Sequence, residues 1–165
     1  MDNAKHRAYD VPMINRYTTK ELPLYAHIPG ETPHPKKSGG HSEGVPDPVT
    51  QEINDSNWQT HEDYLYGVDL FNLKFYWESH VWWEAVWKAC PKGPERDFIQ
   101  GLIKVSAAAL KSRMNEADIA KDHALRAHEL MAAKFVSQQS AFGVSSHWWN
   151  TIKTTHDEPL ELSFE

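Results

Sequence analysis

Two side chains one helical turn apart, His80 and Glu84, are the residues of this chain best suited to chemistry. They lie in an aromatic run that reads Tyr-Trp-Glu-Ser-His-Val-Trp-Trp-Glu-Ala-Val-Trp over positions 76–87. On a helical wheel the two share one quadrant with Trp77 and Trp87, which predicts a buried imidazole–carboxylate pair flanked by indole rings. Such a carboxylate needs a partner, because burying an unpaired charge is costly.

Two interpretations of this pair stay open. In the first, His80 and Glu84 form a ligand or metal site, or act as catalytic residues in general-base chemistry on a small molecule. In the second, they hydrogen-bond to each other and fix helix packing, and the protein is a non-catalytic structural or protein-interaction module. A His and a Glu at positions i and i+4 occur often by chance, so the pair alone does not show that the protein is an enzyme.

A polar stripe on the next helix carries Gln100 and Lys104. Such a stripe is usually the solvated face of a helix, but the small residues Gly101 and Ala108 would allow another helix to approach closely. If Gln100 or Lys104 then faces Glu84, the buried carboxylate has its partner. The candidate ligand-binding residues are therefore Glu78, Trp77, Trp87, Gln100 and Lys104.

The elements that must position these residues are helices, since helical periodicity begins near Trp58 and no alternating run predicts strands. The expected helices cover residues 58–71, 74–89, 94–113 and 116–136, with a short fifth over 146–152. Ser56 or Asn57 is expected to cap the first helix. Short connections make neighbouring helices antiparallel, so the fold class is all-α, a compact bundle of four to five helices.

An irregular arm precedes the bundle, because residues 1–56 hold seven prolines and four glycines, which rule out a long helix. The stretch 22–30 contains apolar residues that would gain from burial, so we expect an ordered arm lying on the bundle, while a disordered tail stays open as the alternative. We divide the chain into an arm (1–56), a helical core (57–138) and a C-terminal short helix with a tail (139–165), all within a single domain.

Composition excludes several classes of partner. The net charge of −6 and the pI near 5.9 leave no basic field for nucleic acid. No stretch approaches the roughly 20 apolar residues that span a bilayer, and residues 1–20 lack the apolar core of a signal peptide. The single cysteine, Cys90, fits a reducing compartment, so we expect a cytoplasmic protein. A homodimer through an exposed part of helix 116–136 stays open.

The motifs at 76–87 and 98–103 resemble the family catalogued as domain of unknown function 309. Its pattern, Glu-x-His-Glu-x-x-Glu-x-x-Trp followed by Phe-Leu-Gln-Gly-Leu-Ile-Gln, is matched by Glu78, His80, Glu84, Trp87, Gln100 and Gly101. The resemblance implies an all-helical fold and no established activity. Val81 replaces a family glutamate and Lys104 a family glutamine, which puts any function of those two positions in doubt. Lys104 could instead supply the counter-charge for Glu84.

The arm is similar to one branch of the same family, which carries a Pro-Gly-x-x-Pro-His-Pro element and then a Gly-His pair. Here these are residues 29–35, which include His34, and residues 40–41, which include His41. The resemblance implies that both histidines fold over the bundle toward His80. Together with Glu84 they would form a divalent metal site suited to zinc or iron. The alternative is that His34 and His41 cap turns in a structural strap.

Overall fold

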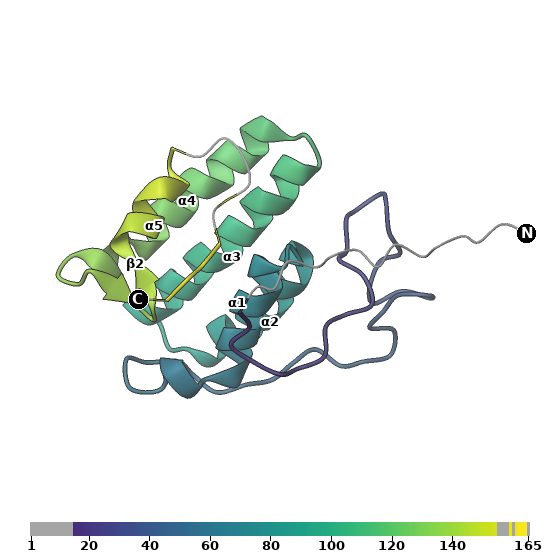
Figure 1. Ribbon diagram of the computed structural model, residues 1–165, viewed down its shortest axis with the longest axis horizontal. Helices are drawn as coiled ribbons and strands as arrows, with labels where there is room; N and C mark the ends of the chain where they lie inside the picture. Colours follow the sequence, from purple (N-terminus) through teal and green to yellow (C-terminus); the bar gives the residue numbers. More distant parts are fainter. Residues whose placement is uncertain (1–14, 155–158, 160, 165) are drawn as a thin grey trace, which may run out of the picture.

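Five α-helices dominate the computed structural model, which describes residues 15–154, 159 and 161–164 (Figure 1). Their bounds are α1 Glu62–Asn72, α2 Tyr76–Ala89, α3 Pro94–Arg113, α4 Ala117–Phe135 and α5 Ser146–Ile152. A 3-10 turn, η1 Trp58–Thr60, precedes α1, and a hairpin of β1 Ser140–Ala141 and β2 Val144–Ser145 precedes α5. The predicted all-α bundle is confirmed.

The start of α1 differs from the expectation, because His61 caps it and neither Ser56 nor Asn57 does. The Nδ1 atom of buried His61 accepts the backbone N–H of Tyr64 at 3.2 Å. Its Nε2 lies 2.9 Å from the carbonyl oxygen of Gln51 and donates to it. The expected cap was wrong because η1 separates residues 56 and 57 from the first turn of α1.

α3 packs between α2 and α4, and α3 and α4 run side by side over most of their length (Figure 1). Their close approach depends on Gly101 of α3, where an added Cβ would lie 2.3 Å from Cγ of Met131 on α4. Met131 is fully buried. The small residue at position 101 therefore allows the helix contact that the sequence predicted.

Trp83 of α2 fills the contact between α1 and α2 and is completely buried. Its Nε1–H donates to the carbonyl oxygen of Tyr64 at 3.2 Å. An added Cβ at Gly67 of α1 would lie 2.3 Å from the same Nε1 atom. The indole thus needs glycine at this position of α1.

Residues 15–57 form neither helix nor strand, and this arm runs along α1 and α2 (Figure 1). Asp69, buried on α1, accepts the backbone N–H groups of Tyr17 at 2.7 Å and Thr18 at 2.9 Å. Tyr17 also meets the C-terminal residues, because its ring centroid lies 4.4 Å from that of Phe164 and its hydroxyl accepts the Phe164 N–H at 3.1 Å. The predicted packing of an irregular arm on the bundle is confirmed.

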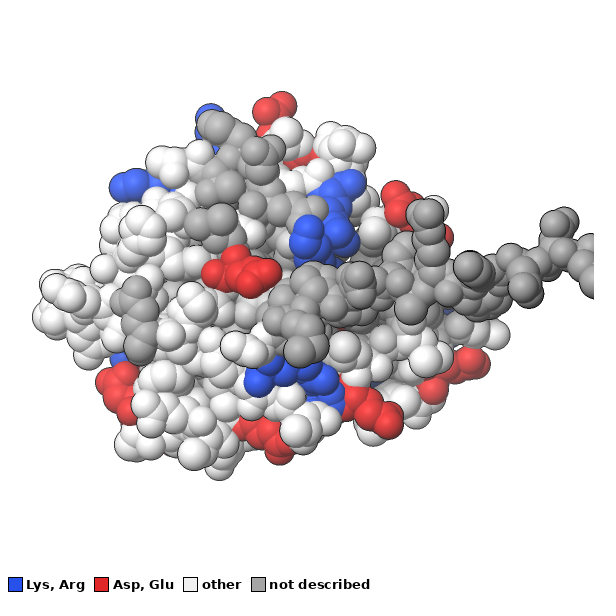
Figure 2. Space-filling view, in the orientation of Figure 1, with Lys and Arg blue, Asp and Glu red and all other residues white. Residues whose placement is uncertain are grey.

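Charged side chains are spread over the described surface in small groups. Figure 2 shows Lys and Arg residues scattered among Asp and Glu residues on one face, without a continuous field of either sign among the atoms it colours. None of the described helices has the length and apolar composition needed to cross a membrane.

Candidate functional site

α2 has two different faces. Tyr76, Ser79, Trp83 and Val86 are buried at spacings of three and four residues, as expected for the side that packs into the bundle. Another face looks toward arm residues 36–48 and forms with them an open pocket of about 190 Å³. We call it the His80 pocket, and it is lined by Lys36, Asp47, Pro48, Trp77, His80, Val81, Glu84, Ala85 and Lys88.

His80 and Glu84 are close together but are not buried. Nε2 of His80 lies 3.6 Å from Oε2 of Glu84, and the two side chains are 41% and 40% exposed. Nζ of Lys88 lies 3.4 Å from the other carboxylate oxygen of Glu84. The expectation of a dry pair between indole rings was wrong, because this side of α2 is covered by the irregular arm rather than by another helix.

The imidazole of His80 is nevertheless perturbed. Partial burial lowers the pKa of His80 below the usual 6.5, while the Glu84 carboxylate acts in the opposite direction. The ammonium of Lys104 lowers this pKa further. His80 is therefore neutral at pH 7 and has one ring nitrogen able to accept a proton.

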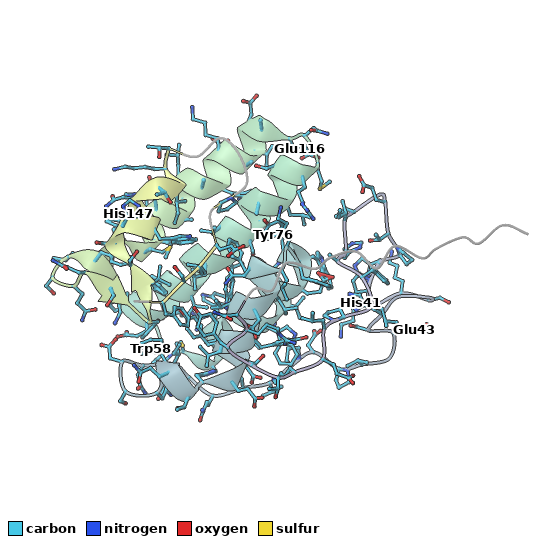
Figure 3. All side chains as sticks on the ribbon, in the orientation of Figure 1. His41, Glu43, Trp58, Tyr76, Glu116 and His147 are labelled. Carbon is cyan, nitrogen blue, oxygen red and sulfur yellow. The ribbon has the colours of Figure 1, made fainter. Side chains whose placement is uncertain are left out.

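The buried carboxylate of α2 belongs to Glu78, whose side chain is 3% exposed. Its Oε1 atom accepts the backbone N–H of His27 at 2.7 Å and Nε2–H of His41 at 3.0 Å. Its Oε2 atom is buried and has no hydrogen-bond partner among the described residues. Glu78 thus ties the arm to α2. His41, the arm residue that donates to it, is labelled in Figure 3.

The arm histidines reach α2 at a different place from the one expected. His41 binds Glu78, and the ring of His34 lies edge-on to Trp77 with centroids 5.7 Å apart. Over the described ranges, no three His, Cys, Asp or Glu side chains are placed to hold a metal ion. The zinc or iron set of His34, His41, His80 and Glu84 is therefore not assembled.

The remaining candidates do not line the His80 pocket. The indole of Trp87 is covered by the guanidinium of Arg96, 4.0 Å from the ring centroid. Gln100 and Lys104 are half-buried on α3, and neither lines the pocket. The described ion pairs of Glu84 are with His80, which was one of the expected partners, and with Lys88, which the sequence did not indicate.

Sequence reasoning missed the residues that fix the arm. Asp69 binds the arm near residue 17, and Lys20 forms an ion pair with Asp63 of α1. The available signal for Asp69 was a lone acid in the apolar run Leu-Tyr-Gly-Val-Asp-Leu-Phe. No comparable signal existed for His27, because it binds Glu78 through its backbone N–H.

The stretch that carries most of this geometry, residues 64–122, matches the family model described as Domain of unknown function (DUF309). Over these residues the chain is similar to the DUF309 family. The DUF309 match covers nearly all of α1, α2 and α3 and the start of α4. It includes Asp69, Glu78, His80 and Glu84 but none of the arm. No curated protein and no solved structure matches this chain.

Proposed function

We propose that the protein binds a small polar molecule in the His80 pocket and that His80 acts there as a general base. The observation that carries this proposal is a neutral, partly exposed imidazole in the wall of an open pocket. A general base must be reachable by its substrate and must be unprotonated at the working pH. His80 meets both conditions.

Glu84 supports the same role. Its carboxylate lies nearest to Nε2 of His80, which leaves Nδ1 to take a proton from a hydroxyl or amine of the ligand. The imidazolium that forms is then stabilised by the negative charge of Glu84. Glu84 is a positioning and charge-stabilising residue in this scheme, and the proton itself moves to His80.

The other residues of the pocket suit a small molecule with both polar and apolar parts. Trp77 and Pro48 offer apolar surface, while Lys36, Asp47 and Lys88 offer charges of both signs. We place this function in the cytoplasm, the reducing compartment that the single cysteine favours.

The second candidate function is a non-catalytic interaction module. It is favoured by two apolar side chains of the arm, Leu24 and Val49, which are 91% and 94% exposed. Their exposure would suit contact with another protein. In that case His80 would have no reactivity beyond that of an ordinary surface histidine.

Hydrolysis of p-nitrophenyl acetate tests the proposal, because a reachable neutral imidazole speeds this reaction when it takes a proton from the attacking water. We expect His80→Gln to remove about half or more of the protein's hydrolytic rate at pH 7, because His80 keeps the unprotonated form that reacts. The lost part should grow with pH and reach half of its final size below pH 6.5, since the pKa of His80 is lowered.

His147→Gln is the matched control. His147 is exposed on α5 and lies on the opposite side of the molecule from His41 and Glu43 of the arm (Figure 3). Its replacement should change the rate much less than the replacement of His80. Equal rates for the wild-type protein and His80→Gln, or equal losses in the two variants, would refute the general-base role and favour the interaction module.

A further inference from the structure

A second pocket lies beside the His80 pocket, under the same part of the arm. It has a volume of about 150 Å³ and shares Lys36, Pro48, Trp77 and Val81 with its neighbour. Glu78 lines this second pocket and does not line the first. We call it the Glu78 pocket.

The carboxylate of Glu78 is only half satisfied. Oε1 accepts two hydrogen bonds from the arm, from His27 and His41, whereas Oε2 is buried and has none among the described residues. Buried polar atoms almost always have a partner, and an unpaired charged oxygen carries a large desolvation cost. A ligand that donates a hydrogen bond to Oε2 would remove this cost.

Most of the other residues of the Glu78 pocket are apolar or aromatic, and Lys36, His41 and Ser42 are the polar ones. Trp77 and Trp82 line it together with Pro23, Pro46 and Val45. Indole rings attract cations through their electron-rich faces. The chain shows this already, because Nζ of Lys20 lies 4.4 Å from the ring centroid of Trp82.

Lys36, the lysine that lines this pocket, forms its described contacts with residues other than Glu78. Nζ of Lys36 lies 3.1 Å from a carboxylate oxygen of Asp47 and also donates to the carbonyl oxygen of Val45. Lys36 is therefore engaged within the arm. An anionic ligand would be repelled by Glu78, and a purely apolar ligand would leave Oε2 without a partner.

We propose that the Glu78 pocket binds the ammonium group of a small organic amine. The ammonium donates a hydrogen bond to Oε2 of Glu78, and the apolar body of the amine packs against the indoles of Trp77 and Trp82. Because Oε2 is covered, arm residues 36–48 move slightly outward when the amine enters, which their lack of regular secondary structure permits. This inference goes beyond the proposed function and does not depend on His80 acting as a base.

Three molecules with the same ring test the charge requirement in the full-length protein: benzylamine, benzyl alcohol and benzoate. Isothermal titration should show the tightest binding for benzylamine, affinity weaker by about tenfold or more for benzyl alcohol, and no detectable binding for benzoate. Nuclear magnetic resonance should show the indole N–H signals of Trp77 and Trp82 shifting as benzylamine is added. Equal affinities for the amine and the alcohol would overturn the proposal.

Variants identify the carboxylate. Glu78→Gln should weaken benzylamine binding by about tenfold or more, whereas Glu84→Gln, in the neighbouring pocket, should leave it within about twofold. Trp82→Leu keeps the arm contacts of Glu78 and should also weaken binding. Wild-type affinity in Glu78→Gln, or a greater loss in Glu84→Gln, would overturn the assignment.

A further control separates ligand binding from arm docking, since Glu78 also holds the arm. Asp69→Asn loosens the arm at a separate anchor, on α1, and changes no residue that lines the Glu78 pocket. We expect this variant to bind benzylamine within about twofold of the wild-type protein. A loss as large as that of Glu78→Gln would show that arm docking alone governs binding, and the amine site would be refuted.

Discussion

Asp69 and Glu78 are both buried carboxylates that hold the arm, yet they differ in how many of their oxygens are engaged. Oδ1 of Asp69 accepts the backbone N–H of Tyr17, and Oδ2 accepts both the backbone N–H and the hydroxyl of Thr18. Nε of Arg16 lies 3.5 Å from Oδ2. Asp69 is thus saturated and structural, whereas Glu78 keeps one oxygen for a ligand.

Asp69→Asn should destabilise the protein by about 1–3 kcal/mol, because the amide removes the charge and turns an N–H₂ group toward N–H donors. Urea unfolding measures the loss in stability. Hydrogen exchange should increase at residues 17 and 18 at the same time. The matched control is Glu31→Gln, a change at an exposed arm carboxylate, which should alter neither measurement. Unchanged exchange at residues 17 and 18 in Asp69→Asn would contradict the anchoring role.

Among the helices, the contact between α3 and α4 depends most clearly on one small residue. A Cβ at Gly101 would meet Cγ of Met131 at 2.3 Å and the backbone oxygen of Ala127 at 3.1 Å. The backbone oxygen cannot rotate away, and the methionine is enclosed by the core. Alanine at this position therefore forces α4 outward.

Gly101→Ala should lower the free energy of unfolding by about 1–2 kcal/mol, although alanine favours helix formation by up to about 1 kcal/mol over glycine. Chemical unfolding of four proteins, the wild type, each single variant and the double variant with Met131→Ala, tests the cause. Gly101→Ala should cost clearly less when Met131 is already alanine. The same cost in both backgrounds would show that the clash with Met131 is not the reason.

The helices could be predicted from the sequence to within a few residues, because apolar periodicity marks their cores and Pro91 and Pro94 mark the break between α2 and α3. The site could not. The wheel of α2 showed apolar residues on nearly every side, but it cannot distinguish a covering helix from a covering arm. The contacts that place the arm use backbone N–H groups of His27 and Tyr17, which leave no pattern in the sequence.

Across the described part of the molecule, four histidines share one property. Burial is the leading cause that lowers the pKa of His27, His80, His123 and His128 below the usual 6.5. As the pH falls below about 6.5, the unfolded chain therefore takes up protons before the folded protein does. The free energy of unfolding therefore decreases as the pH falls from about 6.5 to the lowered pKa values. Below those values, these four histidines change it no further.

Urea unfolding at pH 7.5 and pH 5.5 should show lower stability at the acidic pH. The change in the free energy of unfolding cannot exceed about 1.4 kcal/mol per pH unit for each histidine. Asp63 does not contribute in this range, because its pKa is lowered from the usual 3.8 and its carboxylate therefore takes up a proton only at more acidic pH. The double variant with His123→Gln and His128→Gln should show a flatter dependence. A stability that is constant or higher at pH 5.5 would contradict the four shifts.

The contact between Tyr17 and Phe164 brings the two ends of the described chain together. A pulling force applied to both ends would load this contact first, together with the packing of the Phe164 ring on Trp58 and Tyr64. Once it breaks, the force would peel the arm away from α1 and α2, while the helices remain folded. Tension on the chain ends would thus open both pockets before the bundle itself begins to unravel.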